Sequence, residues 1–151
     1  MSKDILTRSD NSEIFLYGYP DFPIYAHKGR TSSYPRFRCA AHWHEDLEFH
    51  LVLEGELTCD VNEETVTIAA GNGIRINSRQ LHSNYSPEKT ECVYLCVLLH
   101  PGLLSATDTI ALGYVSPFLN HPGMPFCLLN QSVPWQKAVL GWILEIYHEG
   151  N

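Results

Sequence analysis

Short apolar runs, interrupted at close intervals by turn-forming residues, fill the first two thirds of this sequence. Runs of this kind are typical of strands, and their close spacing is typical of an all-β sandwich or barrel. We expect strands over residues 14–19, 24–27, 36–42, 47–53, 56–61, 64–68, 73–76, 82–85 and 92–100. Turn residues lie between several of them, and the glycine of Glu54-Gly55 predicts a tight hairpin there.

The pattern changes at Pro101-Gly102, where the predicted strands end. A short helix is expected within residues 103–114 and a loop over residues 121–125. A clearer helix follows, with apolar residues at helical spacing from Trp135 to Ile146, Ser132 as the N-cap and Pro134 in the first turn. We therefore expect a β-barrel with an N-terminal arm over residues 1–100 and a helical segment over residues 101–151, packed against the barrel or a partner.

Charge and composition narrow the classes of function. The formal net charge is −7. Because phosphate binding needs a surface of Lys and Arg, this chain is not expected to bind nucleic acid by itself. The polar start lacks the pattern of a signal peptide, and the longest apolar stretch, residues 93–99, is too short to span a bilayer. Five cysteines without a CxxC pair are typical of reduced thiols. We expect a cytoplasmic domain without membrane contact.

The feature richest in chemistry is a pair of histidines followed by a carboxylate. His42, His44 and Glu48, followed by Gly55, form the pattern H-x-H-x3-E-x6-G. Residues two apart in a strand point to the same side, so His42 and His44 share a face, and a turn at residues 45–46 would return Glu48 to it. A second piece of chain, about a hairpin away, contributes His82.

These four side chains have the ligand types of a divalent transition-metal site. Imidazole suits zinc, nickel and iron, and the carboxylate tolerates manganese, so His42, His44, Glu48 and His82 are candidate ligands for Zn, Ni, Fe or Mn. The alternative is that the imidazoles are hydrogen-bonded side chains lining a ligand pocket. Both interpretations place the four residues inside the barrel.

Four further residues are candidates for binding a small ligand. Arg36 and Arg38 precede His42 at matching parity in a predicted strand, so a guanidinium could hold a carboxylate, a phosphate or sugar hydroxyls; the alternative is a solvated strand end. His50 lies two residues after Glu48, and Tyr94 lies on the strand after His82. For His50 the alternative is a hydrogen-bonded core histidine, and for Tyr94 it is core packing.

The two pieces of chain resemble the signature motifs of the cupin superfamily. The first motif matches through His42, His44, Glu48 and Gly55. The second matches in part: Gly71 and His82 are in place, whereas Asn77, Arg79 and Ser86 stand where proline, glycine and asparagine are usual. The resemblance implies a mainly β fold, a cupin jelly-roll barrel (double-stranded β-helix) followed by C-terminal helices. Cupins with this ligand set are similar to metal-dependent dioxygenases and isomerases.

Nearly the whole chain resembles the N-terminal sensor domain of AraC-type transcription regulators. The resemblance implies a small polar effector, a sugar or an organic acid, bound in the barrel, and a homodimer formed through the C-terminal helices. It also implies that DNA is bound only by a helix-turn-helix domain that is not in this chain. Sensors of this type mostly work without a metal. The alternative is a stand-alone metal-dependent cupin enzyme, a dioxygenase or isomerase.

Overall fold

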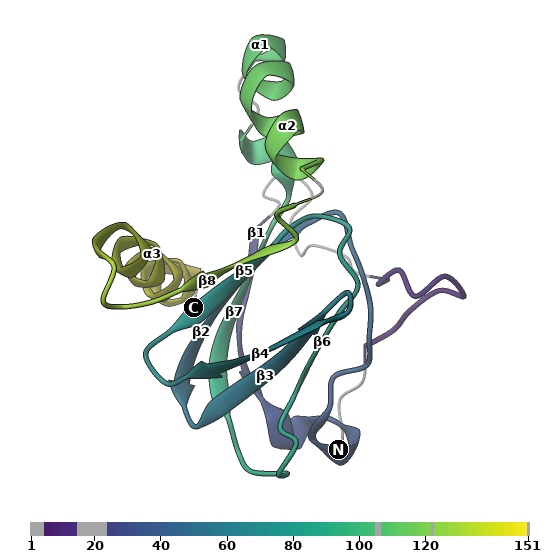
Figure 1. Cartoon of the computed structure of the whole chain (residues 1–151), viewed down its shortest axis with the longest axis vertical. Coiled ribbons are helices and arrows are strands. Elements are labelled where there is room, and N and C mark those ends of the chain that lie inside the picture. Colours follow the sequence, from purple (N-terminus) through teal and green to yellow (C-terminus); the bar gives the residue numbers. More distant parts are fainter. Residues whose placement is uncertain (1–4, 15–23, 105–106, 122, 151) are drawn as a thin grey trace.

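The computed structural model describes residues 5–14, 24–104, 107–121 and 123–150. The described part is mainly β, with two antiparallel sheets that face each other (Figure 1). The larger sheet has the strand order β1 (Ile24–Arg30), β7 (Val93–Leu99), β2 (Leu47–Glu54), β5 (Gly73–Ile76), β8 (Phe126–Leu129). The smaller sheet has the order β4 (Glu64–Ala69), β3 (Glu56–Val61), β6 (His82–Tyr85). The strand expected over residues 14–19 lies almost wholly outside the described residues.

The main core fills the space between the two sheets. Alternate residues of each strand point inward, as the period of two in a strand requires. The larger sheet contributes Val52, Ile74 and Ile76, and the smaller sheet contributes Leu57 and Val61, all of them fully buried. Removing these apolar side chains from water is the principal force that holds the sheets face to face.

Residues with a positive φ form two turns of different kinds, at Asn62 and at Gly55. Asn62, in the left-handed region with φ 54°, forms a tight hairpin in which Val61 pairs with Glu64. Gly55 also has a positive φ, 78°, but it carries the chain from β2 in one sheet to β3 in the other. The hairpin predicted at Gly55 is therefore wrong: the turn is a corner between sheets.

The predicted strand over residues 36–42 does not form. A 3-10 turn occupies Pro35–Phe37, and Arg36 has φ 55°, which is incompatible with a continuous strand. Two isolated bridges, Arg38 to Tyr85 and His42 to His82, join this stretch to β6, together with a hydrogen bond from Cys39 N to Asn84 O. The expectation that Arg36 and Arg38 share a strand face with His42 is therefore wrong.

Helix α3 (Pro134–Gly150) covers the outer face of the larger sheet (Figure 1). Leu140 and Ile143 pack against Leu51, Leu95 and Val97 in a second apolar cluster. The helix begins at the predicted place, but the Ser132 hydroxyl donates to Asn130 Oδ1 at 2.7 Å instead of capping it.

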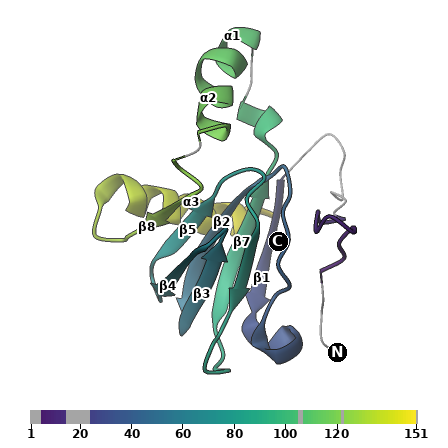
Figure 2. The ribbon, with the colours of Figure 1, turned by 45° about the vertical axis from the view of Figure 1, so that its right-hand side comes forward.

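A helical connection projects from one end of the barrel between β7 and β8 (Figure 2). It contains a 3-10 turn at Pro101–Leu104, α1 (Asp108–Ile110), a π-helical turn at Ala111–Val115 and α2 (Ser116–Leu119). The chain then returns as β8, which pairs with β5. The segment over residues 101–151, expected to be helical, therefore also contains a strand. No helix in the described ranges is long and apolar enough to cross a bilayer.

Candidate metal centre and adjoining cavity

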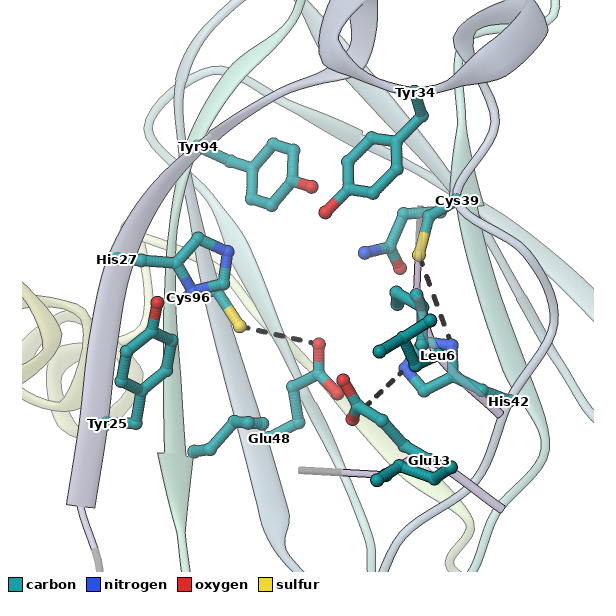
Figure 3. Close-up of a pocket in the computed structure, with 14 residues that line it drawn as sticks. Leu6, Glu13, Tyr25, His27, Tyr34, Cys39, His42, Glu48, Tyr94 and Cys96 are labelled. Atoms are coloured by element: carbon teal, nitrogen blue, oxygen red, sulfur yellow. Dashed lines mark hydrogen bonds and ion pairs between the residues drawn. The ribbon is translucent and has the colours of Figure 1, made fainter. Parts of the chain in front are cut away.

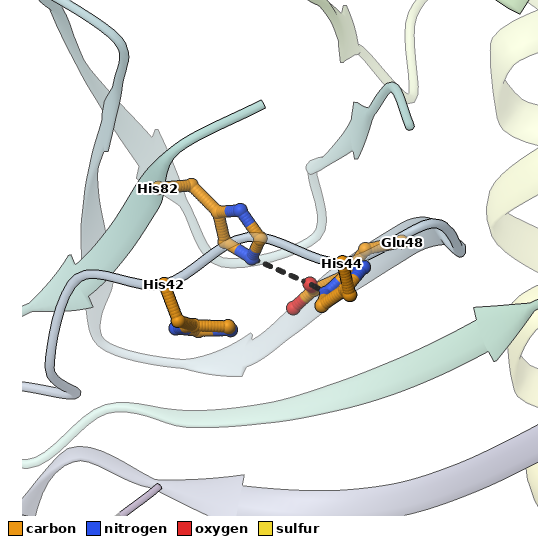
Figure 4. A group of neighbouring side chains, drawn as sticks. All are labelled: His42, His44, Glu48 and His82. Carbon is orange, nitrogen blue, oxygen red and sulfur yellow. Dashed lines mark hydrogen bonds and ion pairs between the residues drawn. The ribbon is translucent and has the colours of Figure 1, made fainter. Parts of the chain in front are cut away.

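Three imidazoles and one carboxylate meet inside the barrel (Figure 4). His42 and His44 come from the stretch before β2, Glu48 from β2 and His82 from β6. A bend over residues 45–46 separates His44 from β2 and turns Glu48 back toward the histidines, as the sequence predicts. All four side chains are buried, and one potential ligand atom of each lies within 4.8 Å of the others.

The backbone holds each imidazole in the orientation that a metal ligand needs. Nδ1 of each ring lies close to the carbonyl oxygen of a residue two positions away, at 2.8 Å for His42 and His82 and 3.1 Å for His44. A carbonyl can only accept, so Nδ1 carries the hydrogen and donates it. In the neutral ring this leaves the Nε2 lone pair available to the centre, which is the tautomer of a ligating histidine.

Two of these Nε2 atoms face one oxygen of Glu48. His44 Nε2 lies 2.8 Å and His82 Nε2 lies 2.7 Å from Glu48 Oε2. Lone pairs on nitrogen and oxygen repel each other at such distances unless a proton or a cation lies between them. Donor atoms of neighbouring ligands in a zinc-like shell stand roughly 3 Å apart, because each bond is about 2.1 Å long. The residues present therefore fit a divalent transition metal.

The charges of the centre respond to burial and to Glu48. Burial opposes ionisation of Glu48, but His82 and His50 outweigh it and hold the pKa of Glu48 well below its ordinary value. Burial also opposes the charge of His44, but its hydrogen bond with Glu48 raises the pKa of His44 to about 9. Burial, with His82 nearby, lowers the pKa of His42 to about 4. In the metal-free centre a proton on His44 therefore balances the carboxylate.

The other oxygen of Glu48, Oε1, accepts hydrogen bonds from two buried side chains. His50 Nε2 donates to Glu48 Oε1, and the Cys96 thiol donates to the same oxygen at 3.5 Å. His50 is completely buried and does not line the adjoining cavity. The structure thus shows His50 as a hydrogen-bonded core histidine beside the carboxylate, the alternative to a ligand contact.

A cavity of about 220 Å³ adjoins the centre (Figure 3). His42 and Glu48 belong both to the centre and to the wall of the cavity. Further wall residues are Tyr25, Tyr34 and Tyr94, with His27, Asn84, Cys39, Cys96 and Leu98. Tyr94, a predicted ligand contact, thus lies on the wall, and Figure 3 shows its hydroxyl turned toward that of Tyr34. Such a mixture of aromatic surface and few polar groups is typical of small-molecule sites.

The two predicted arginines lie elsewhere. Arg38 Nη1 donates to Ser83 Oγ at 3.0 Å, and its guanidinium lies 3.6 Å from the ring centre of Tyr85. Arg36 is exposed to solvent. Neither lines the cavity, and no Lys or Arg does so among the residues that the structure describes. The reason is the turn at Pro35–Phe37, which replaces the strand that would have aimed both side chains inward.

One residue of the site is missing from the sequence interpretation. Glu13 lines the cavity, and its Oε2 lies 4.0 Å from Nε2 of His42. It belongs to a polar stretch near the N-terminus, where a single carboxylate before an apolar run carries no distinctive pattern. Only the folding of that stretch over the barrel brings Glu13 to the centre.

Comparison with known proteins agrees with this architecture. Residues 33–98 match the cupin domain family Cupin_2, which confirms the expected cupin barrel. Over 144 residues the chain is 26% identical to a protein of Bacillus subtilis (strain 168) called "Uncharacterized HTH-type transcriptional regulator YdeC". The match covers 95% of this chain and 49% of that protein, so the chain spans about half the length of this relative.

Solved structures are also similar over parts of the chain. A cupin 2 conserved barrel domain protein from Salinispora arenicola CNS-205 has a TM-score of 0.48 and 14% identity, covering 72% of this chain and 91% of that one. The salicylate 1,2-dioxygenase of Pseudaminobacter salicylatoxidans has a TM-score of 0.46 and 21% identity. That match covers 50% of this chain and 22% of the dioxygenase.

Proposed function

We propose that this cupin domain senses a small polar effector for a helix-turn-helix transcription regulator, and that the effector binds in the barrel cavity beside a metal centre. The regulator-named relative, which matches along almost the entire chain, supports the regulatory role. Contact with DNA belongs to a separate part of the regulator in this proposal. The net charge of −7 supports that division, because an acidic domain repels phosphates.

One observation carries the proposal: the cavity has walls from two different parts of the molecule. Glu48 and Tyr94 belong to the strands of the barrel, whereas Leu6 and Ile14 belong to the N-terminal stretch that lies against it. A ligand in the cavity contacts both parts and favours the arrangement in which they are together. A differential affinity of about 1–3 kcal/mol between two arrangements is enough for such a switch.

The cavity wall favours particular chemistry in the effector. Tyrosine hydroxyls, the Asn84 amide and the carboxylates of Glu13 and Glu48 suit the many donors and acceptors of a sugar. An organic acid needs a cationic partner, and the described wall offers neither Lys nor Arg. A divalent ion (Zn, Ni, Fe or Mn) held by the centre supplies that charge when bound. Binding of an organic acid therefore depends on the metal, whereas binding of a sugar does not require it.

The C-terminal helix provides the surface for a homodimer in this proposal. Trp135 and Trp142 on α3 are 59% and 58% exposed, and Ile146 lies one turn beyond Trp142. Large exposed apolar side chains on one helix are typical of an interface. Pairing of two α3 helices would fix the orientation of the two barrels relative to each other, and with it that of the regulator domains attached to them.

The test is a binding screen by thermal unfolding and calorimetry on the complete regulator, with and without Zn²⁺. The panel pairs sugars with hydroxy acids of similar size. We expect a hit that stabilises the wild type, changes DNA affinity and binds more weakly to Tyr25→Phe, which removes one hydroxyl from the wall. Tyr114→Phe, 76% exposed on the helical projection, is the matched control. A hit that binds Tyr25→Phe and wild type equally and leaves DNA affinity unchanged contradicts the proposal.

A second candidate function is that of a metal-dependent enzyme, because the cavity and the candidate metal centre have residues in common. Because His42 and Glu48 line the cavity, a bound molecule reaches the metal position, and three histidines with one glutamate leave coordination sites open. Incubation of the Fe²⁺-loaded protein with its best ligand and oxygen separates the two functions. Recovery of the ligand unchanged favours the sensor, and catalytic turnover favours the enzyme.

A further inference from the structure

We propose that Glu13 supplies a second carboxylate to the metal centre, and that metal binding thereby fixes the N-terminal hairpin (residues 6–14) to the barrel. The inference rests on the metal centre of the proposed function and goes beyond it by coupling that centre to a separate structural element.

The N-terminal hairpin is closed by its own backbone. Ile14 N donates to Leu6 O at 2.8 Å, Arg8 N donates to Ser12 O at 2.9 Å, and Thr7 pairs with Glu13. Figures 1 and 2 show this stretch as a purple loop at the edge of the barrel, outside both sheets. It is thus a small unit attached to the barrel rather than part of it.

The hairpin docks on the residue that lies between two of the candidate ligands. Glu13 N donates to Trp43 O at 2.9 Å, and Trp43 N donates to Asn11 O at 3.1 Å. The Trp43 indole also donates to Asp10 O at 2.9 Å. Trp43 is flanked by His42 and His44, so the backbone that carries both histidines is the backbone on which the hairpin sits. Movement of one requires adjustment of the other.

The Glu13 carboxylate points from the hairpin to the centre (Figure 3). Its side chain is only 13% exposed, and its Oε2 lies 4.0 Å from His42 Nε2. His42 donates through Nδ1 to Ala40 O, so the atom that faces Glu13 presents a lone pair. Two acceptors therefore face each other in a mostly buried place. A cation near both atoms resolves this conflict, and the histidine cluster is built to hold one.

A bound divalent ion changes the balance of charge around the hairpin. Without it, Glu13 brings a second carboxylate toward the buried Glu48, which is unfavourable at low dielectric. With it, the ion attracts both carboxylates. If metal binding strengthens hairpin docking, hairpin docking must strengthen metal binding by the same factor, because linkage is reciprocal.

The experiment measures Zn²⁺ affinity by chelator competition, and hydrogen exchange of the hairpin amides with and without Zn²⁺, on the full chain. The variants are Glu13→Gln, which has nearly the same shape and keeps the backbone bonds to Trp43, and the control Glu64→Gln on the exposed side of β4. In wild type and control we expect Zn²⁺ to slow hairpin exchange. In Glu13→Gln we expect affinity to fall roughly 10-fold and the effect of Zn²⁺ on the hairpin to disappear.

Wild-type affinity of Glu13→Gln for Zn²⁺, or Zn²⁺-dependent protection of its hairpin as strong as in wild type, overturns the inference. Failure of the wild type to bind Zn²⁺, Ni²⁺, Fe²⁺ or Mn²⁺ overturns it too, together with the metal centre. Effector binding is measured separately, so a sugar that binds the metal-free regulator and changes its DNA affinity would retain the sensor role in that case.

Discussion

The ring of His50 stacks on the ring of Tyr94, with centroids 5.2 Å apart and planes 11° apart. Tyr94 faces the cavity, while His50 donates through Nε2 to Glu48 of the candidate metal centre. Two aromatic rings thus connect the wall that a ligand would touch with the carboxylate that a metal would use. Because both rings are almost completely buried, displacement of one has to be accommodated by the other.

Replacing His50 by phenylalanine should weaken the centre. His50→Phe keeps an aromatic ring beside Tyr94 but removes the donor to Glu48 Oε1. We expect Zn²⁺ affinity to fall about 10- to 100-fold, as for other residues that orient a ligating group. Chelator competition measures the affinity, and His100→Phe, at an exposed position, serves as control. Equal affinity of His50→Phe and wild type would show that Glu48 does not need His50 to orient it.

Removal of the metal should lower the stability of the folded protein, by an amount that grows with the logarithm of the metal affinity. A ligand at 100 times its dissociation constant stabilises the folded state by about 2.7 kcal/mol. We expect the unfolding temperature of the wild type to fall on treatment with a chelator and to recover with excess Zn²⁺. His82→Ala, which removes a buried candidate ligand, should unfold at the same temperature with and without chelator. A chelator effect of equal size in His82→Ala would place the metal elsewhere.

The packing of α3 on the sheet should contribute strongly to stability. Ile143 is 2% exposed and packs in the cluster formed by α3 and the larger sheet, whereas Leu144, its neighbour in sequence, is 39% exposed. Ile143→Ala should therefore destabilise the domain by about 2–5 kcal/mol, and Leu144→Ala by much less. Urea unfolding at equilibrium measures both variants, and similar losses in the two would mean that the helix is oriented differently.

The exposed side of α3 should govern association. Trp142→Lys places a charge in the proposed dimer interface, 58% exposed in the single chain. We expect this variant to be a monomer at concentrations where the wild type is a dimer, as measured by analytical ultracentrifugation. Leu112→Lys, on the helical projection, is the control and should remain a dimer. The proposed interface is wrong if the wild type and Trp142→Lys have the same mass in solution.

The cysteines should differ sharply in reactivity. Burial raises the pKa of Cys92 to about 12 and raises that of Cys59 further above its ordinary value, so little of either thiol is ionised below pH 10. Cys127, on β8, is only partly buried. Alkylation of the folded protein at pH 8, followed by peptide mass spectrometry, should modify Cys127 first. Early modification of Cys59 would contradict the packing between the sheets.

Local sequence patterns predict most of the barrel. The bounds of β3, β5 and β6 agree with the expected ranges residue for residue, because alternating residues and strong turn residues mark them. The convergence of His42, His44 and Glu48 follows from spacing within one short stretch, which a single bend completes.

The features that local patterns do not predict depend on distant contacts. β8 is four residues long and becomes a strand by pairing with β5, some fifty residues earlier in the chain. Arg38 points away from the cavity because Pro35 begins a tight turn. Its guanidinium then lies over the ring of Tyr85. Glu13 reaches the centre only because the N-terminal hairpin docks on Trp43.

The metal content of the protein tests the account most directly. Elemental analysis is made on protein purified without a metal-affinity tag, alongside His44→Ala. We predict close to one Zn, Ni, Fe or Mn per chain in the wild type and none in His44→Ala, because His44, His42, Glu48 and His82 form one buried set. Absence of these metals from the wild type, even after incubation with each ion, would contradict the metal centre and leave its histidines as the lining of a ligand pocket.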